Sequence, residues 1–154
     1  MRQIAIVSGK GGTGKTTVTA CLAHLARQAV TADCDVDAAN LALLMPGREI
    51  LRERFFAGQR ASVNPGRCDG CGLCLDACRF GAMDLNSDGV VMVDPISCEG
   101  CAVCSRVCPV DAITMNPNQA GHMMVRQTPW GPLVHGGLGI AQDNSGKLVA
   151  AVRE

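Results

Sequence analysis

The feature that most restricts the fold of this chain is a pair of cysteine runs near its middle. The first run reads CDGCGLCLDACRFGAM and the second CEGCAVCSRVCPVDAI. Each cysteine of the first run has a counterpart in the second at one constant offset, which is the distance along the chain from Cys68 to Cys98. A duplication on this scale predicts a compact module with two similar lobes.

The spacing within each run points to a particular metal chemistry. Both runs read C-x2-C-x2-C-x3-C, the spacing of bacterial ferredoxins with [4Fe–4S] clusters, in which the fourth cysteine ligates the other cluster. Pro109 follows the second run as in that pattern, whereas Arg79 stands at the equivalent place after the first. The predicted ligand sets are Cys68, Cys71, Cys74 and Cys108 for cluster 1, and Cys98, Cys101, Cys104 and Cys78 for cluster 2.

The ten cysteines have two other possible uses besides iron–sulfur ligation. A disulfide framework does not suit the reducing interior of a cell, which is the location expected for this chain. Structural zinc prefers two separated C-x-x-C pairs, whereas here a third cysteine follows after only three positions, and it does so in both runs. Cys21 and Cys34 stand apart from the runs and are expected to be small buried residues.

A glycine-rich loop precedes the cysteine runs. Gly9, Gly14, Lys15 and Thr16 fit the phosphate-loop pattern G-x-x-x-x-G-K-[ST], after the apolar run QIAIV and before a helix-like segment. Glycines let backbone N–H groups turn toward an anion, Lys15 neutralises the outer phosphates, and the hydroxyl of Thr16 ligates Mg²⁺. The alternative is a glycine-rich turn with an incidental lysine. The residues expected to bind ATP and Mg²⁺ here are Gly9, Gly11, Gly12, Thr13, Gly14, Lys15, Thr16 and Thr17.

An additional lysine in this loop carries a family resemblance. The letters KGGTGKTT resemble the K-G-G-x-G-K-[ST]-[ST] loop of the deviant-Walker ATPases, the MinD/ParA-like family that includes the nitrogenase iron protein. The resemblance implies that Lys10 reaches the nucleotide of the opposite subunit in an ATP-sandwiched homodimer of the full-length parent. It also implies that, in the acidic stretch DCDVDAAN, Asp35 orients the attacking water and Asp33 supports the Mg²⁺ shell. The alternative for these aspartates is an acidic turn at the end of a strand.

The fold expected from these features is α/β. It combines a partial P-loop NTPase, with a parallel βαβ start, and an inserted α+β domain like bacterial ferredoxin. The apolar run at 3–7 and the segment 29–32 are the expected strands, with a helix over 16–28 between them. The expected domains are 1–60 for the N-terminal NTPase part, 61–116 for the two-cluster domain and 117–154 for a truncated return segment.

Turn residues and apolar runs predict the secondary structure of the segments outside these motifs. Residues 46–66 are expected to be a junction, because MPGRE and VNPGR contain turn residues. MMVRQT at 123–128 is expected to be a strand, PWGPLVHGGLG at 129–139 a turn region, and SGKLVAAVRE at 145–154 the first turns of a helix. Five arginines between Arg48 and Arg67 are expected on a solvated face rather than in an anion site.

Composition excludes several classes of function. The net formal charge is zero and no basic run is present, so the chain has no nucleic-acid signal. No apolar stretch approaches the roughly 20 residues of a membrane helix, and no signal peptide is recognisable, which predicts a cytoplasmic protein without a membrane contact. Apolar residues make up 47% of the chain, enough for a core, but aromatic residues are only 3%, so that core is aliphatic.

The resemblance also covers the order of the segments, since one branch of the family carries a two-cluster ferredoxin module after the first switch. The second switch and the adenine pocket that follow in that branch are not found here, and after Asp111 the only acids are Asp143 and Glu154. The chain therefore resembles the N-terminal part of a longer protein, and ATP hydrolysis by these residues alone is not expected.

Three functions are compatible with these sequence features. The first is an ATP-binding iron–sulfur protein in which nucleotide gates electron transfer through two [4Fe–4S] clusters to a redox partner that the sequence does not identify. The second is a simple ferredoxin-type carrier with an inert NTPase part. The third is an iron–sulfur assembly carrier, which complete internal ligand sets disfavour.

Overall fold

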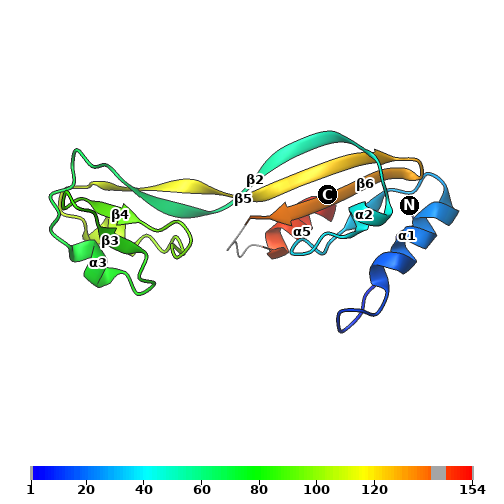
Figure 1. Ribbon diagram of the computed structural model, residues 1–154, viewed down its shortest axis with the longest axis horizontal. Helices are drawn as coiled ribbons and strands as arrows, with labels where there is room; N and C mark the ends of the chain where they lie inside the picture. Colours follow the sequence, from blue (N-terminus) through cyan, green and yellow to red (C-terminus); the bar gives the residue numbers. More distant parts are fainter. Residues whose placement is uncertain (1, 140–144, 154) are drawn as a thin grey trace. The chain divides into compact units, whose positions relative to one another are not determined.

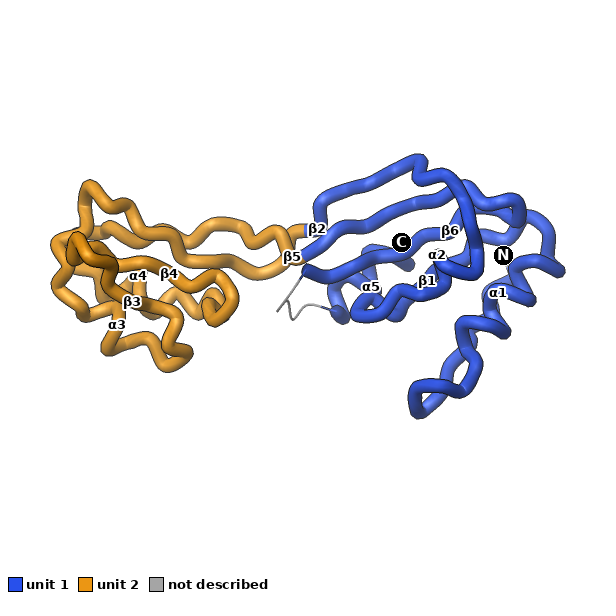
Figure 2. Tube along the Cα trace, viewed as in Figure 1, with its two compact units in different colours: residues 1–55, 121–154 blue, residues 56–120 orange. Residues whose placement is uncertain are grey.

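The chain divides into two compact units. A computed structural model describes residues 2–139 and 145–153. Unit 1 contains Met1–Phe55 and Gly121–Glu154, and unit 2 contains Phe56–Ala120, drawn in blue and orange in Figure 2. Two long strands, β2 (Arg48–Val63) and β5 (Ile113–Thr128), contribute residues to both units.

Unit 1 is built on a sheet with the strand order β1-β6-β5-β2. Strand β1 (Thr31–Asp33) pairs in parallel with β6 (Gly131–Leu138), and β6 pairs in antiparallel fashion with β5, opposite Gly121–Thr128. The helices of this unit are α1 (Lys15–Ala26), α2 (Leu41–Leu44) and α5 (Ser145–Arg153), labelled in Figure 1. The parallel pair thus joins segments that are far apart in the sequence.

The two faces of β6 carry two separate cores. Leu133 is fully buried with Leu41 and Met45 at α2 and with Ala23 of α1. Val134, the next residue, packs with Val36 and with Leu148 and Val152 of α5. Since successive side chains of a strand point to opposite faces, helices cover both sides of this sheet.

Unit 2 consists of short elements around a core that includes cysteine. Its elements are α3 (Leu73–Ala77), β3 (Met83–Leu85), β4 (Val91–Val93) and α4 (Val103–Val107), together with the adjoining parts of β2 and β5. Strands β3 and β4 form an antiparallel pair. The buried core is Ala61, Cys74, Met83, Val91, Cys104 and Ile113.

The sequence repeat of unit 2 is also a structural repeat. The backbone N–H of Asn64 donates to the carbonyl of Ala112 at 2.8 Å. At the equivalent positions of the repeat, the N–H of Asp94 donates to the carbonyl of Ala82 at 2.9 Å. Helix α4 follows α3 at the same offset. The two-lobed module predicted from the repeat is therefore present, with each lobe completed by strand residues of the other.

The strand expected over 3–7 is absent, which corrects the predicted βαβ start. Residues 2–7 have no regular structure, and the side chains of Ile4 and Val7 are 78% and 85% exposed. A strand needs a hydrogen-bonding neighbour, and the parallel partner of β1 is β6 instead. The helix expected over 16–28 and the strand over 29–32 are confirmed as α1 and β1, with slightly different ends.

Two further segments differ from the sequence prediction. The junction expected over 46–66 is largely the strand β2, and most of the turn region expected over 129–139 is the strand β6. In β6 the glycines and proline lie in a strand whose hydrogen bonds to two neighbours decide its conformation. The strand at 123–128 is confirmed as part of β5, and the helix expected from 145 is confirmed as α5, while Asp143 and Glu154 lie outside the described residues.

Candidate metal centres

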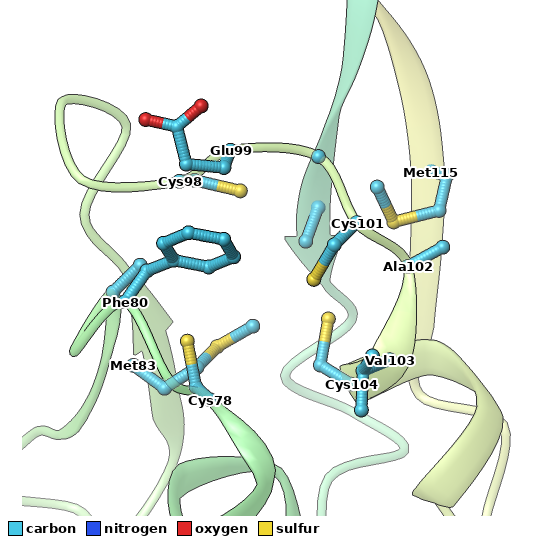
Figure 3. Close-up of a pocket in the computed structure, with 13 residues that line it drawn as sticks. Cys78, Phe80, Met83, Cys98, Glu99, Cys101, Ala102, Val103, Cys104 and Met115 are labelled. Carbon is cyan, nitrogen blue, oxygen red and sulfur yellow. The ribbon is translucent and has the colours of Figure 1, made fainter.

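Two cavities in unit 2 are each lined by four cysteines. The first cavity is lined by Cys68, Cys71, Cys74 and Cys108. The second cavity is lined by Cys98, Cys101, Cys104 and Cys78, and Figure 3 shows these four side chains around it. Each cavity thus combines three cysteines of one run with the last cysteine of the other. These are the same groupings that the spacing predicts as ligand sets.

Left-handed backbone at fixed positions shapes the loop that carries each set of cysteines. Gly70 and Gly72 have φ angles of 70° and 79°, and the equivalent Gly100 and Ala102 have φ angles of 67° and 63°. Each loop then enters a short helix, so that Cys74 and Cys104 lie in α3 and α4. The repeated backbone conformation turns the first three thiols of each run toward one cavity.

The thiols differ in their exposure. Cys74 and Cys104 are 5% and 7% exposed, whereas Cys71 and Cys101 are exposed. Burial raises the pKa of the Cys74 and Cys104 thiols above its ordinary value. Without a metal these two groups are therefore protonated at neutral pH, and binding a metal requires the release of their protons.

The donor set of each cavity fits a [4Fe–4S] cluster, which takes four thiolate ligands. The rest of the lining is mainly aliphatic, and the backbone N–H of Ala112 donates to the sulfur of Cys108 at 3.3 Å. Among residues 2–139 and 145–153, no three His, Cys, Asp or Glu side chains converge closely enough to hold a single metal ion.

The glycine loop is exposed and leads directly into α1. Gly12 and Gly14 have φ angles of 74° and 83°, and an added Cβ at either would meet nothing within 4 Å. The ammonium of Lys15 donates to the hydroxyl of Ser8 at 3.0 Å, and the hydroxyl of Thr13 donates to the same oxygen at 2.8 Å. The loop therefore has open space around its glycines, and the side chain of Lys15 reaches back to Ser8 at the start of the loop. Gly9, Gly11, Lys10 and Thr17 are exposed, and Thr16 is half-buried.

Asp33, the last residue of β1, makes hydrogen bonds with residues that follow it closely in the chain. The carboxylate of Asp33 accepts hydrogen bonds from the backbone N–H groups of Asp35 and Leu41, at 3.1 and 3.0 Å. In the β1–β6 ladder Asp33 is paired with His135. Burial lowers the pKa of this histidine, although the charge of Asp33 acts in the opposite direction. In the described part of the chain, no hydrogen bond or ion pair joins Asp33 or Asp35 to the glycine loop.

Some expectations about single residues need correction or addition. Cys21 and Cys34 are exposed, not buried. Sequence reasoning did not single out the other residues that line the second cavity, among them Phe80, Met83 and Met115. The repeat relates Phe80 and Met83 to Val110 and Ile113, but only the structure shows that these positions line the two cavities.

Comparison with known proteins agrees with this site. Residues 61–115 match the family model of the 4Fe-4S dicluster domain. A probable ferredoxin of Methanosarcina thermophila is 50% identical over 34 residues, which are 22% of this chain and 59% of that protein. Residues 61–115 are therefore a ferredoxin-like iron–sulfur domain within a mixed α/β chain.

Two longer relatives come from Methanocaldococcus jannaschii. An uncharacterized protein is 38% identical over 84 residues, covering 53% of this chain and 30% of the relative. An uncharacterized ATP-binding protein is 42% identical over 62 residues, covering 36% of this chain and 24% of the relative. The alignments thus span less than a third of either relative. Within residues 2–139 and 145–153, none of the helices has the length and apolar character needed to cross a bilayer.

Proposed function

We propose that this chain transfers electrons through two [4Fe–4S] clusters held in unit 2. The observation that carries the proposal is the pair of four-cysteine cavities, each drawing on both runs. When bound, such clusters accept and donate single electrons. The ligands of cluster 1 are Cys68, Cys71, Cys74 and Cys108, and those of cluster 2 are Cys98, Cys101, Cys104 and Cys78.

The protein residues around the thiols have two tasks in this proposal. The left-handed loops hold three thiols of each set in place, so that little reorganisation is needed when a cluster gains or loses charge. The apolar residues Val91 and Ile113 at the first cavity, and Met83 and Met115 at the second, keep water away from the sulfur atoms. Burial and hydrogen bonds to sulfur are among the features by which proteins set cluster potentials.

Iron and sulfide analysis after anaerobic reconstitution tests this proposal. Two clusters correspond to about eight iron and eight sulfide per chain. Replacing the buried ligand, Cys74→Ser, is expected to lower both contents to about four, because cluster 1 then lacks a thiolate. Cys21→Ser is the matched control, since Cys21 is exposed and lies outside both cavities. It is expected to keep about eight. A colourless wild-type protein that binds zinc instead would refute the proposal.

We further propose that the loop at residues 9–17 binds the phosphates of Mg-ATP and that nucleotide binding influences electron transfer. Two findings support this. The glycines of the loop have open space around them, and the helix α1 begins directly after Gly14, so its unpaired N–H groups lie at the loop. A relative 42% identical over 62 residues is named as ATP-binding. Lys10, Lys15, Thr16, Asp33 and Asp35 keep the roles that the family resemblance implies.

Equilibrium binding of Mg-ATP to the intact, cluster-loaded chain tests the nucleotide proposal. Lys15→Ala is expected to weaken binding at least tenfold, because it removes the cation at the outer phosphates. Lys147→Ala removes the one lysine outside the loop. Lys147 is exposed in α5, and its replacement is expected to leave binding unchanged. If the wild-type chain does not bind Mg-ATP, it is a simple ferredoxin-type carrier and the nucleotide proposal fails.

Cluster transfer separates these proposals from the assembly-carrier alternative. Complete internal ligand sets imply that the clusters stay bound, because each has four thiolates from this chain. Mixing the loaded protein with an apo-ferredoxin and following cluster content of both proteins is the measurement. Rapid handover would favour an assembly carrier over an electron carrier.

A further inference from the structure

The two four-cysteine cavities are equivalent by the repeat but differ in lining. At the second cavity the residues two and five positions after the last cysteine of the first run are Phe80 and Met83. At the first cavity the equivalent residues, after Cys108, are Val110 and Ile113. The acidic residues of the two linings match, since Asp69 lines the first cavity and Glu99 the second. The linings therefore contain one acid each, and only the second contains an aromatic ring.

A positively charged side chain lies over the face of the Phe80 ring. The guanidinium carbon of Arg79 lies over the ring of Phe80, 4.7 Å from its centroid. Figure 3 shows the ring beside the sulfur atoms of Cys78 and Cys98, which line the same cavity. The equivalent dipeptide at the first cavity is Pro109–Val110, which has neither a cation nor an aromatic face to hold one. Stacking on an aromatic ring is a favourable position for a guanidinium.

The sign of the resulting effect follows from electrostatics. Reduction adds one negative charge to a cluster, and a nearby cation stabilises that charge, so it raises the reduction potential. Arg79 is exposed to solvent, which screens its charge and keeps the effect moderate. The acids that line the two cavities match, but the cations near the ligand cysteines do not, since Arg79 follows Cys78 whereas Arg67 and Arg106 lie near Cys68 and Cys108. The feature specific to the second cavity is the stacking of Arg79 on a ring that lines it.

We infer that the Arg79–Phe80 pair raises the reduction potential of the cluster bound by Cys78, Cys98, Cys101 and Cys104. This inference rests on the proposed function, because it requires a bound cluster. One electron, supplied by an external one-electron reductant, is then added to this cluster more readily than it would be without the pair, and no bond or proton is exchanged. Phe80 is a positioning residue, which holds the charge of Arg79 at the cavity.

A potentiometric titration of the loaded chain, followed by electron paramagnetic resonance, tests the inference. In the wild type two midpoint potentials are expected. Arg79→Gln is expected to lower one of the two potentials more than the other, by about twofold or more in the ratio of reduced to oxidised cluster at a fixed potential. Arg79→Lys keeps the charge and is expected to retain most of the wild-type separation. Phe80→Val, which copies the other cavity, is expected to lower the same potential as Arg79→Gln.

The controls distinguish failure of this inference from failure of the proposed function. Arg48→Gln removes the same net charge from an exposed position in unit 1 and is expected to leave the separation unchanged. Pro109→Arg places a cation at the equivalent site and is expected to raise the potential that Arg79→Gln leaves nearly unchanged. A wild-type chain without two clusters would refute the proposed function. A chain with two clusters whose potentials shift equally, or not at all, in Arg79→Gln would refute this inference alone.

Discussion

At the scale of single residues, close backbone approaches explain why glycine stands between the first two cysteines of each run. A Cβ at Gly100 would overlap the carbonyl oxygen of Gln59, and a Cβ at Gly70 would overlap that of Gly89. Gln59 and Gly89 are themselves equivalent positions of the repeat, so the same contact occurs in both lobes. Both glycines also have positive φ angles. The letters DG and EG in the two runs therefore reflect steric requirements of the loops.

A comparison of two glycine substitutions tests this steric argument. Gly100→Ala is expected to destabilise unit 2 by about 2–4 kcal/mol, because it adds a backbone clash to the strain of a left-handed residue. Gly72→Ala has similar strain, with a φ angle of 79°, but no atom within 4 Å of the new Cβ, and about 1–2 kcal/mol is expected. Urea unfolding of the loaded chains, followed by circular dichroism, gives both values. Equal losses would contradict the argument.

Not every left-handed position in these loops is glycine. Ala102 and Asp111 have φ angles of 63° and 49°, and their equivalents in the first lobe are Gly72 and Gly81. Ala102 initiates α4 and Asp111 follows Cys108, so the tertiary arrangement of the cysteines holds both residues in an unfavourable conformation. From the sequence alone, only the glycine members of these pairs indicate a left-handed backbone.

At the scale of elements, prediction from sequence succeeded where a pattern is local. Helix α1 was expected from the apolar positions between Ala20 and Ala26, and helix α5 from the segment SGKLVAAVRE. The two lobes of unit 2 follow from the repeat, because the chain uses the same hydrogen bonds at equivalent positions, as at Asn64 and Asp94. These features depend on neighbours close in the sequence or on a copy of the same sequence.

Prediction failed for elements whose conformation depends on distant partners. Strand β6 contains Gly131, Pro132, Gly136 and Gly137, which signal a turn when read alone. In the sheet β6 lies between β1 and β5. Leu148 of α5 packs against Gly136, and a Cβ at position 136 would be only 2.8 Å from the Leu148 Cγ atom, so glycine is the residue that leaves room for Leu148. Conversely, the apolar run at 3–7 has strand composition but no strand beside it among the residues that the structure describes. Pairing in the sheet overrides local preference in both cases.

At the scale of the whole molecule, the division into two units separates cores of different kinds. The cores of unit 1 are formed by side chains such as Leu133 and Leu148, and none of the proposed cluster ligands belongs to them. The core of unit 2 includes Cys74 and Cys104, which are also proposed ligands. The stability of unit 2 is therefore linked to cluster binding, whereas the cores of unit 1 contain no residue of the cluster sites.

Removal of iron is expected to affect the two units differently. Treating the loaded chain with an iron chelator should expose the amides of unit 2, because four thiols around each cavity lose the cluster that joins them. The amides of β6, between two other strands, should keep their protection. Hydrogen–deuterium exchange with mass spectrometry measures both regions in one sample. Equal loss of protection in β6 and in α3 and α4 would contradict this expectation.

The amino-acid sequence by itself determined the chemistry of this protein and the equivalence of its two lobes. Cysteine spacing and an internal repeat can be read directly from the sequence, and the first three thiolates of each set come from one short loop, while the fourth comes from the other run. Tertiary structure alone decided which apolar segments become strands and which residues line the two cavities, whereas the sequence already shows Arg79–Phe80 after one run and Pro109–Val110 after the other. The physical reason is that strands and cavity linings depend on partners that are distant in the sequence, and the identity of such partners is settled only when the chain packs.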